Sequence, residues 1–326
     1  MRVAGIDCGT NSIRLLIADV PGKDGALDDV ARLMDVVRLG QGVDRTGQFD
    51  PEALKRALDK TEEYAALCKE HGVESIRFAA TSATRDASNR EEFLQGVLER
   101  LGVPVQVLSG DDEANTSFAG ASSAMEEGGP SPIIVVDLGG GSTELVLGAV
   151  GSGVISEHSM NVGCVRMHER HLVSDPATPE QVAAARVDVN AALDEAEKHI
   201  DFGATEGLVG LAGTITTLTA KAIGLEKYDA SKIHGTALTV NETIEACEWF
   251  IASSKEERAT LGFLHPGRSD VIASGTLVWE EVVKRVAQRM TERGKSLDTV
   301  VTSEHDILDG MALWAAREPQ RPTWAE

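Results

Sequence analysis

One motif occurs twice in this chain. Residues Ile6–Leu15 align without gaps on Val136–Leu145. In each copy an apolar strand ends in an aspartate, a turn of small and polar residues follows, and a second apolar strand begins. This order is typical of a β-hairpin, with glycines where the backbone turns tightly or approaches a ligand. Two such hairpins, far apart in the sequence, predict two lobes of similar construction facing each other; a chance likeness is the alternative.

Strands and helices alternate between and after the two hairpins, which indicates an α/β protein. The clearest helix is expected from Asp50 to Gly72, because Asp50 can cap it, Pro51 suits its first position and its apolar residues repeat at helical spacing. The next helix is expected to open with Asn89 as its cap. Further strands are expected at 75–80, 105–108, 207–212 and 299–302, and further helices at 89–101, 178–199, 241–252, 271–290 and 306–317.

The best candidate for a linker is the stretch Glu126–Pro132, which is rich in glycine and proline. It precedes the second hairpin directly. The linker divides the chain into an N-terminal lobe of residues 1–125 and a C-terminal lobe of residues 126–305.

Composition excludes several classes of protein. Acidic residues outnumber basic ones by 52 to 31, and the net charge of −21 argues against nucleic-acid binding, which depends on a basic surface. The four cysteines are far apart and form no Cys-x-x-Cys pair, so a reducing, cytoplasmic location is predicted. No apolar run is long enough to cross a membrane, and the N-terminus has the pattern of a strand, not of a cleavable leader.

The turns of the two hairpins have the chemistry of a phosphate site. Backbone N–H groups and hydroxyls of a Gly-, Ser- and Thr-rich turn can cradle an anion. A carboxylate just before the turn can hold a Mg²⁺ ion that neutralises phosphate oxygens. Asp7 and Asp137 stand at that place, and the two opposed cradles could clasp one phosphate chain between the lobes. For Asp7 alone, a simple turn-forming role is the alternative.

Three further segments join a strand to a helix and carry polar groups suited to phosphate. The stretch Ala80–Asn89 offers hydroxyls, Arg85 and a helix N-terminus in a connecting loop. Glu113, at the start of another helix, is a candidate to orient a nucleophilic water. Its neighbours Asp111 and Asp112 are equally acidic, and carboxylates favour a first helical turn for dipole reasons alone. The third segment, Gly210–Leu218, could receive a nucleotide or a phosphate.

These motifs, in this order, resemble the exopolyphosphatase/guanosine pentaphosphate phosphohydrolase family, and in particular its short, two-domain members. The resemblance extends over essentially the whole chain. It is carried by Ile6–Leu15, Ala80–Asn89, Ser109–Ala114, Val136–Leu145, Ala212–Leu218, Lys232–Gly235, Pro266–Ile272 and Ser303–Gly310. The last of these departs from the family pattern, because 306–310 reads Asp-Ile-Leu-Asp-Gly and lacks the family's arginine.

The resemblance implies the duplicated, two-lobed α/β fold of actin, sugar kinases and heat-shock chaperones (ribonuclease-H-like), with a deep interlobe cleft. The last helix, within residues 306–326, would return to the first lobe, and a homodimer is expected. Glu113 would activate water, while Asp137 and Glu144 would act with Mg²⁺, for which Mn²⁺ is the alternative and Asp7 a further candidate ligand. Substrate phosphates would contact Asn11, Ser12, Arg85, Gly139, Gly140, Gly141, Ser142, Gly213, Thr214 and Arg268.

The expected activity is hydrolytic release of terminal phosphate from inorganic polyphosphate. Guanosine pentaphosphate 5′-phosphohydrolase is the alternative, with the nucleoside placed near Gly213 and Thr214. A third hypothesis is a regulator that binds guanosine penta- or tetraphosphate with little catalysis. Its sequence signature would be loss of the catalytic carboxylates, and both Glu113 and Asp137 are present.

Overall fold

The computed structural model describes residues 1–21, 27–125 and 129–325. The chain divides into two compact units. Unit 1 comprises Met1–Ser123 and Asp306–Glu326, and unit 2 comprises Ala124–His305. The segment 306–326 therefore packs with the first hundred or so residues. Of the expected linker, residues 126–128 lie outside the described residues.

Unit 1 is built on a mixed sheet with the strand order β3-β2-β1-β4-β5. The strand β1 pairs antiparallel with β2 and parallel with β4, so the first hairpin forms as the repeat predicts. The strands are β1 (Arg2–Cys8), β2 (Ser12–Asp19), β3 (Asp28–Val36), β4 (Ser75–Ala80) and β5 (Val105–Val107).

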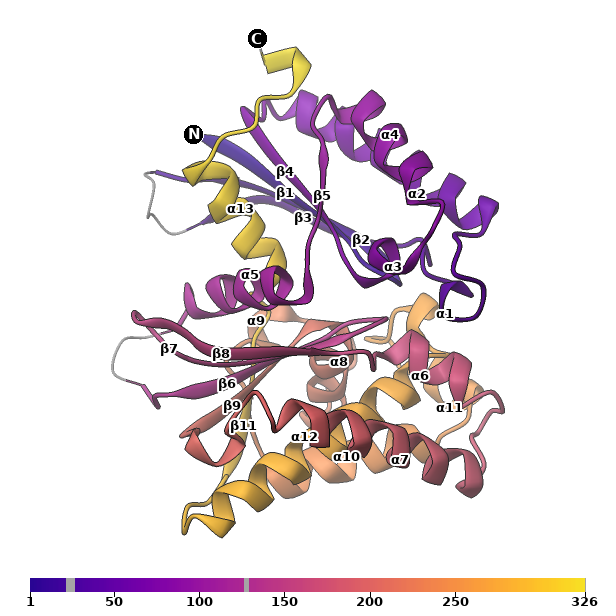
Figure 1. Ribbon diagram of the computed structural model, residues 1–326, viewed down its shortest axis with the longest axis vertical. Coiled ribbons are helices and arrows are strands. Elements are labelled where there is room, and N and C mark those ends of the chain that lie inside the picture. The colour runs from indigo at the N-terminus through magenta and orange to yellow at the C-terminus, as the bar shows by residue number, and fades with distance from the viewer. Residues whose placement is uncertain (22–26, 126–128, 326) are drawn as a thin grey trace. The chain divides into compact units, whose positions relative to one another are not determined.

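Both faces of the central strands in unit 1 are covered, which explains why β1 is apolar from Val3 to Ile6. Alternate residues point to opposite faces. Ala4 and Ile6 join the core beneath α2 (Pro51–Glu70) and α4 (Arg90–Leu101), whereas Val3 packs with residues of α13 (Ile307–Arg317). Figure 1 shows α2 and α4 on one side of this sheet and α13 on the other. The other helices of unit 1 are α1 (Val43–Thr46), α3 (Ser82–Asp86), α5 (Gly110–Ser122) and the 3₁₀ turn η3 (Thr323–Ala325).

Unit 2 repeats this topology. Its sheet has the order β10-β11-β9-β6-β7-β8, so β8-β7-β6-β9-β11 corresponds to β3-β2-β1-β4-β5. The strands are β6 (Ile133–Leu138), β7 (Thr143–Ala149), β8 (Gly153–Met160), β9 (Gly207–Leu211), β10 (Ala237–Thr239) and β11 (Thr299–Thr302). The pairs β6/β7 and β7/β8 are antiparallel, and β6/β9 and β9/β11 are parallel. The predicted duplicated α/β fold is thereby confirmed.

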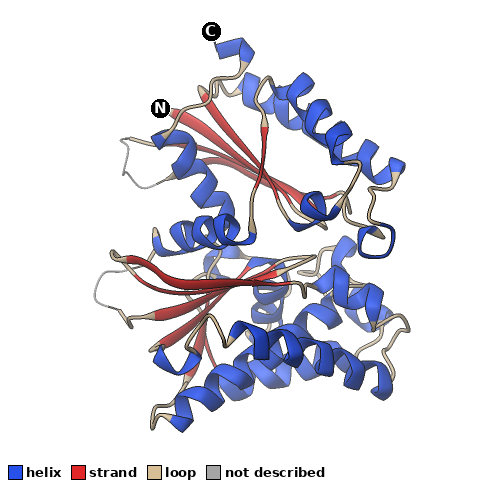
Figure 2. Ribbon diagram, viewed as in Figure 1, coloured by secondary structure: helices blue, strands red, loops and turns tan. Residues whose placement is uncertain are grey.

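Helices make up much of unit 2 (Figure 2) and pack around the long helix α12 (Ile272–Glu292), which buries Trp279 and Val282 in one continuous core. The others are α6 (Cys164–Arg170), α7 (Pro179–Ala196), α8 (Ala212–Ala222), α9 (Ala230–Ile233), α10 (Val240–Ala252), α11 (Lys255–Ala259), η1 (Phe202–Ala204) and η2 (Pro266–Arg268).

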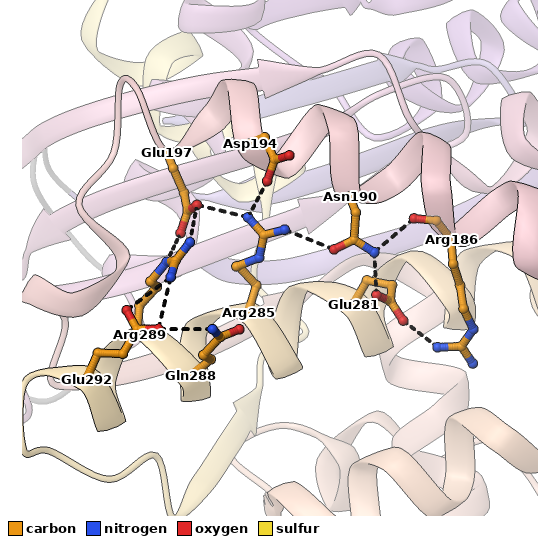
Figure 3. A network of polar contacts seen from close by, with 9 residues as sticks. All are labelled: Arg186, Asn190, Asp194, Glu197, Glu281, Arg285, Gln288, Arg289 and Glu292. Atoms are coloured by element: carbon orange, nitrogen blue, oxygen red, sulfur yellow. Dashed lines mark hydrogen bonds and ion pairs between the residues drawn. The ribbon is translucent and has the colours of Figure 1, made fainter.

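A polar network joins α7 to α12 along their lengths (Figure 3). Arg186 of α7 pairs with both Glu280 and Glu281 of α12. One turn further on, the Nη2 of Arg285 donates to the Oδ1 of Asn190 at 2.9 Å, and its Nη1 donates to Glu197 at 2.8 Å. Glu280 is fully buried, and a buried carboxylate is tolerated only when it is paired. The network therefore fixes the register of these two helices.

The sequence predicted the positions of most of the expected helices and strands correctly. Asp50 caps α2 as predicted, its side chain accepting the N–H groups of Glu52 and Ala53. Asn89 stands at the N-cap of α4 as predicted, but its side chain makes no capping hydrogen bond, because its Oδ1 accepts the N–H of Phe49 at 2.8 Å instead. The predicted loop 80–89 contains the short helix α3. The strands β3, β8 and β10 were not predicted.

The four cysteines are buried and none forms a disulfide. Among the helices described, none is both long and apolar enough to span a bilayer.

The contact between α5 and α13 leaves no room for a side chain at Gly120. A Cβ atom there would lie 1.8 Å from the carbonyl oxygen of Asp306, which is backbone and cannot move aside. We expect Gly120→Ala to destabilise the protein by about 3 kcal/mol in urea unfolding. Gly96→Ala in α4 is the matched control, because its Cβ would meet only the ends of two flexible side chains, those of Leu58 and Arg100. It should change stability by less than about 1 kcal/mol. Equal effects would contradict the explanation.

Candidate functional site

The turn after β1 lies against the start of α3 in unit 1. The Oγ1 of Thr10 and the Oγ of Ser82 are 3.0 Å apart. The backbone oxygen of Asn11 accepts the N–H groups of Val37 at 3.1 Å and Arg38 at 2.8 Å. These bonds fix the turn through its backbone and the Thr10 hydroxyl, so they leave the Asn11 amide available for a ligand.

Three buried oxygens around this turn have no hydrogen-bond partner within residues 1–21, 27–125 and 129–325. They are the Oδ1 of Asp7, the Oδ1 of Asn11 and the Oγ1 of Thr84. A buried polar atom without a partner costs about 1–3 kcal/mol. A hydrogen-bond donor from outside could satisfy these three atoms, which lie together around the turn.

Asp7 is held by one arginine. The Nε and Nη2 of Arg14 donate to its Oδ2 at 3.1 and 2.7 Å, and the same guanidinium donates through Nη1 to Asp306, the N-cap of α13. Burial raises the pKa of Asp7 although the charge and hydrogen bonds of Arg14 oppose the rise. The ionised carboxylate is therefore stabilised less by its partners than it is destabilised by its removal from water.

Arg85 and Glu113 are in contact. The Nη1 of Arg85 donates to the Oε2 of Glu113 at 2.7 Å and to the backbone oxygen of Leu108 at 2.8 Å. Its Nε and Nη2 have no partner in the part of unit 1 that the structure describes. One side of this guanidinium therefore orients a carboxylate while the other remains able to bind an anion.

The structure also separates Glu113 from its acidic neighbours. Asp112 completes a capping box with Ser109, the ordinary role of a carboxylate at this place in a helix. Asp111 is exposed. Glu113 alone is buried, with 7% of its surface exposed, and lies against an arginine. Of these three acidic residues, only Glu113 therefore has the burial and the charged partner that are typical of a functional residue.

In unit 2 the turn Gly139–Ser142 lies on the N-terminus of α6. The backbone oxygens of Gly139 and Gly140 accept N–H groups at the start of α6, and Gly141 accepts the Nε of Arg166 at 2.7 Å. The N–H groups of residues 140–142 donate to no backbone oxygen of the described chain. The turn is therefore anchored through its carbonyls, which leaves its N–H groups to cradle an anion.

Asp137 and Glu144 stand directly opposite each other on β6 and β7. Their side chains point to the same face, and both are buried, with 6% and 1% of their surface exposed. The Oε1 of Glu144 accepts the hydroxyl of Ser159 at 2.7 Å. Two buried carboxylates so close repel unless a cation or a proton lies between them, so the pair fits a divalent cation.

No cage of three or more His, Cys, Asp or Glu side chains occurs in the described part of the chain. A Mg²⁺ ion at Asp137 and Glu144 would complete its shell with water and phosphate oxygens, which is how Mg²⁺ usually binds in phosphoryl-transfer sites.

The start of α8 brings Gly213 against Arg268. A Cβ atom at Gly213 would lie 1.8 Å from the Nη1 of Arg268, so the guanidinium rests on the glycine. The preceding Ala212 has φ 69°, a strained conformation for a residue with a side chain. Thr214 lies beside Cys164; burial raises the pKa of that thiol to about 11, although Arg268 and the Thr214 hydroxyl lower it. A backbone strained to bring a cation to a helix N-terminus suits phosphate binding.

The structure thus brings predicted residues of each unit into local groups. In unit 1, Asp7, Asn11 and Ser12 share the first hairpin, while Arg85 and Glu113 form a pair. In unit 2, the turn Gly139–Ser142 and Gly213, Thr214 and Arg268 lie near Cys164.

The sequence analysis missed Arg14, Asp306 and Cys164. A signal for Arg14 was present, since it is a charged residue in an otherwise apolar strand. The repeat aligns it with Glu144.

Asp7 gives a prediction for stability against pH. Because its pKa is raised on folding, the folded state binds the proton more tightly, and stability falls as pH rises above the ordinary value of 3.8. We expect Asp7→Asn to be more stable than wild type at pH 7, with a gain that shrinks toward zero near pH 4. Urea unfolding across this range measures the difference. A variant less stable than wild type at pH 7 would contradict the prediction.

Comparison with known proteins identifies the family. A model of the Ppx/GppA phosphatase family matches residues 17–306. Exopolyphosphatase 2 of Mycobacterium tuberculosis is 44% identical over 319 residues, 96% of this chain and 98% of that protein. The crystal structure of an exopolyphosphatase-like protein matches with a TM-score of 0.93 at 44% identity, covering 97% of this chain and 99% of that one. An exopolyphosphatase from Cytophaga hutchinsonii matches with a TM-score of 0.86 at 25% identity, covering 98% of each chain. The resemblance seen in the sequence is confirmed, and the chain belongs to the Ppx/GppA phosphatase family.

Proposed function

We propose that this chain is an exopolyphosphatase that releases terminal orthophosphate from inorganic polyphosphate by Mg²⁺-dependent hydrolysis. The observation that carries the proposal is the buried Glu113, held at 2.7 Å by Arg85. Relatives similar over nearly the full chain carry the name exopolyphosphatase, which supports the choice of substrate.

In this mechanism Glu113 is the general base. Its Oε2 is fixed by Arg85, and the carboxylate accepts a proton from a water molecule and orients that water toward the terminal phosphorus. The anchored carboxylate loses little freedom when it acts. The free N–H groups of Arg85 bind a non-bridging phosphate oxygen.

Unit 2 supplies the groups that hold phosphate. The N–H groups of the turn Gly139–Ser142 and the guanidinium of Arg268 bind non-bridging oxygens. Mg²⁺ bound at Asp137 and Glu144 would neutralise charge on the phosphates. Hydrolysis then breaks the P–O bond of the terminal anhydride, the water oxygen joins the leaving orthophosphate, and the shortened chain retains the bridging oxygen.

Guanosine pentaphosphate 5′-hydrolysis is the second candidate. The start of α8, with Gly213 beneath Arg268 and Thr214 following, is a strand-to-helix junction of the kind that receives nucleotides. The same Glu113 would serve, because both substrates end in a phosphoanhydride. A homodimer and a cytoplasmic location stay predictions.

The first test replaces the base. Glu113→Gln keeps the shape and a hydrogen bond to Arg85 but removes the acceptor of the proton. We expect Mg²⁺-dependent phosphate release from short-chain polyphosphate to fall by about 10²- to 10⁴-fold. Asp111→Asn, an exposed neighbour, is the matched control and should retain full activity.

Guanosine pentaphosphate is assayed in parallel. Release from the nucleotide alone would move the assignment to the second candidate. Release from neither substrate, with tight binding of guanosine tetraphosphate, would replace the enzyme by a regulator. Full activity of a folded Glu113→Gln would exclude Glu113 as the base.

The second test displaces Arg268. In Gly213→Ala the new methyl group would occupy the place of the guanidinium, which can swing away because it ends a flexible side chain. We expect an unchanged melting temperature and a KM for polyphosphate raised about 10- to 100-fold, the loss of one charge-assisted contact. Gly207→Ala, whose Cβ would meet its nearest atom at an ordinary 3.5 Å, should leave KM unchanged. Equal KM values in the two variants would show that Arg268 does not bind substrate.

A further inference from the structure

The two hairpins carry opposite charges at the same position. The repeat aligns Arg14 on Glu144. Arg14 stands opposite Asp7 on β1 and β2, just as Glu144 stands opposite Asp137 on β6 and β7. The same backbone pairing therefore gives an aspartate with a guanidinium in unit 1 and an aspartate with a second carboxylate in unit 2.

In unit 1 the place of a cation is already filled. Arg14 donates two hydrogen bonds to the Oδ2 of Asp7 and a third to Asp306. The three side chains are largely buried, with 17% of Arg14 and 7% of each carboxylate exposed. A guanidinium between two buried carboxylates supplies the positive charge that a divalent ion would supply at Asp137 and Glu144. A divalent ion at Asp7 would have to displace this guanidinium.

We propose that Arg14 is the resident cation of the first hairpin. It excludes a divalent ion from Asp7 and holds Asp306 at the start of α13. Divalent-cation binding then belongs to the second hairpin alone, and one position of the repeat, Arg14 or Glu144, decides which hairpin takes the metal. The contrast rests on the proposed function in one respect, the assignment of Mg²⁺ to Asp137 and Glu144. The proposal removes Asp7 from the candidate metal ligands.

The test uses Mn²⁺ as a probe and counts bound ions by electron paramagnetic resonance on the full-length protein. Arg14→Gln removes the resident cation and leaves Asp7 and Asp306 facing each other. We expect this variant to bind one more Mn²⁺ than wild type, whatever the wild-type number. The extra ion should disappear in the double variant Arg14→Gln with Asp7→Asn. No extra ion in a folded Arg14→Gln overturns the proposal.

A matched control removes the neighbouring arginine. Arg32 also pairs with a carboxylate at the start of α13, through Nη2 to the Oδ1 of Asp309 at 2.5 Å. Asp309 is fully buried, and its Oδ2 accepts the N–H of Asp306. The Arg32→Gln variant should therefore bind the same number of Mn²⁺ ions as wild type. An extra ion in this variant as well would show that any lost arginine opens a site, which overturns the specific role of Arg14.

A second variant covers the case in which Arg14→Gln does not fold. Asp7→Asn alone should bind Mn²⁺ with an affinity within about 2-fold of wild type, because Asp7 is no ligand. Loss of a metal ligand, or of a residue that hydrogen-bonds to a ligand, typically lowers the affinity for the metal by 10- to 100-fold. A loss of about 10-fold in Asp7→Asn overturns the proposal. The Mg²⁺ assignment is tested separately with Glu144→Gln. If this variant binds Mn²⁺ as tightly as wild type, Glu144 is not a metal ligand.

Discussion

The guanidinium of Arg14 makes the contacts on which unit 1 depends. It projects from the apolar strand β2, bonds to Asp7 of β1 and bonds to Asp306 at the start of α13. Asp306 is also the first residue of unit 1 after the chain leaves unit 2. Without Arg14 the two buried carboxylates of Asp7 and Asp306 would have no positive charge between them, which is costly in a buried site. One side chain thus couples the hairpin, the returning helix and the crossover of the chain.

The residues just before the crossover are fixed in a corresponding way within unit 2. The hydroxyl of Tyr228 donates to the Oε1 of Glu304 at 2.5 Å, and the N–H of Glu304 donates to the Nδ1 of His234 at 3.3 Å. The ring of His234 packs edge-on against that of His305, with centroids 4.9 Å apart. Residues on each side of the crossover are therefore tied to their own unit. The tie in unit 1 includes Asp7, and the tie in unit 2 lies close to Arg268, a candidate phosphate-binding residue.

The sequence predicted backbone features better than side-chain partners, for a physical reason. The strands Ser75–Ala80 and Thr299–Thr302 were bounded correctly, because apolar and β-branched residues make up most of each. The strand Asp28–Val36 was missed because it is an edge strand with exposed residues and three aspartates. The partners of Asn89 and Arg14 could not be predicted from the local sequence. These partners, Phe49 and Asp306, are 40 and 292 residues away along the chain. Pairing over such distances is invisible to periodicity.

Local pairing also explains how a chain with a large negative charge could bind a polyanion. A net charge of −21 repels a polyanion at long range, but exposed charges are screened beyond about 8 Å at physiological salt. What decides binding is the charge within the first contacts. Several arginines of the described chain are consumed internally, as Arg14, Arg32 and Arg186 show. Arg85 differs, since it satisfies Glu113 with one nitrogen and keeps the others. An acidic surface with a few cations held inside by geometry favours ligands that reach those cations over polyanions that touch only the surface.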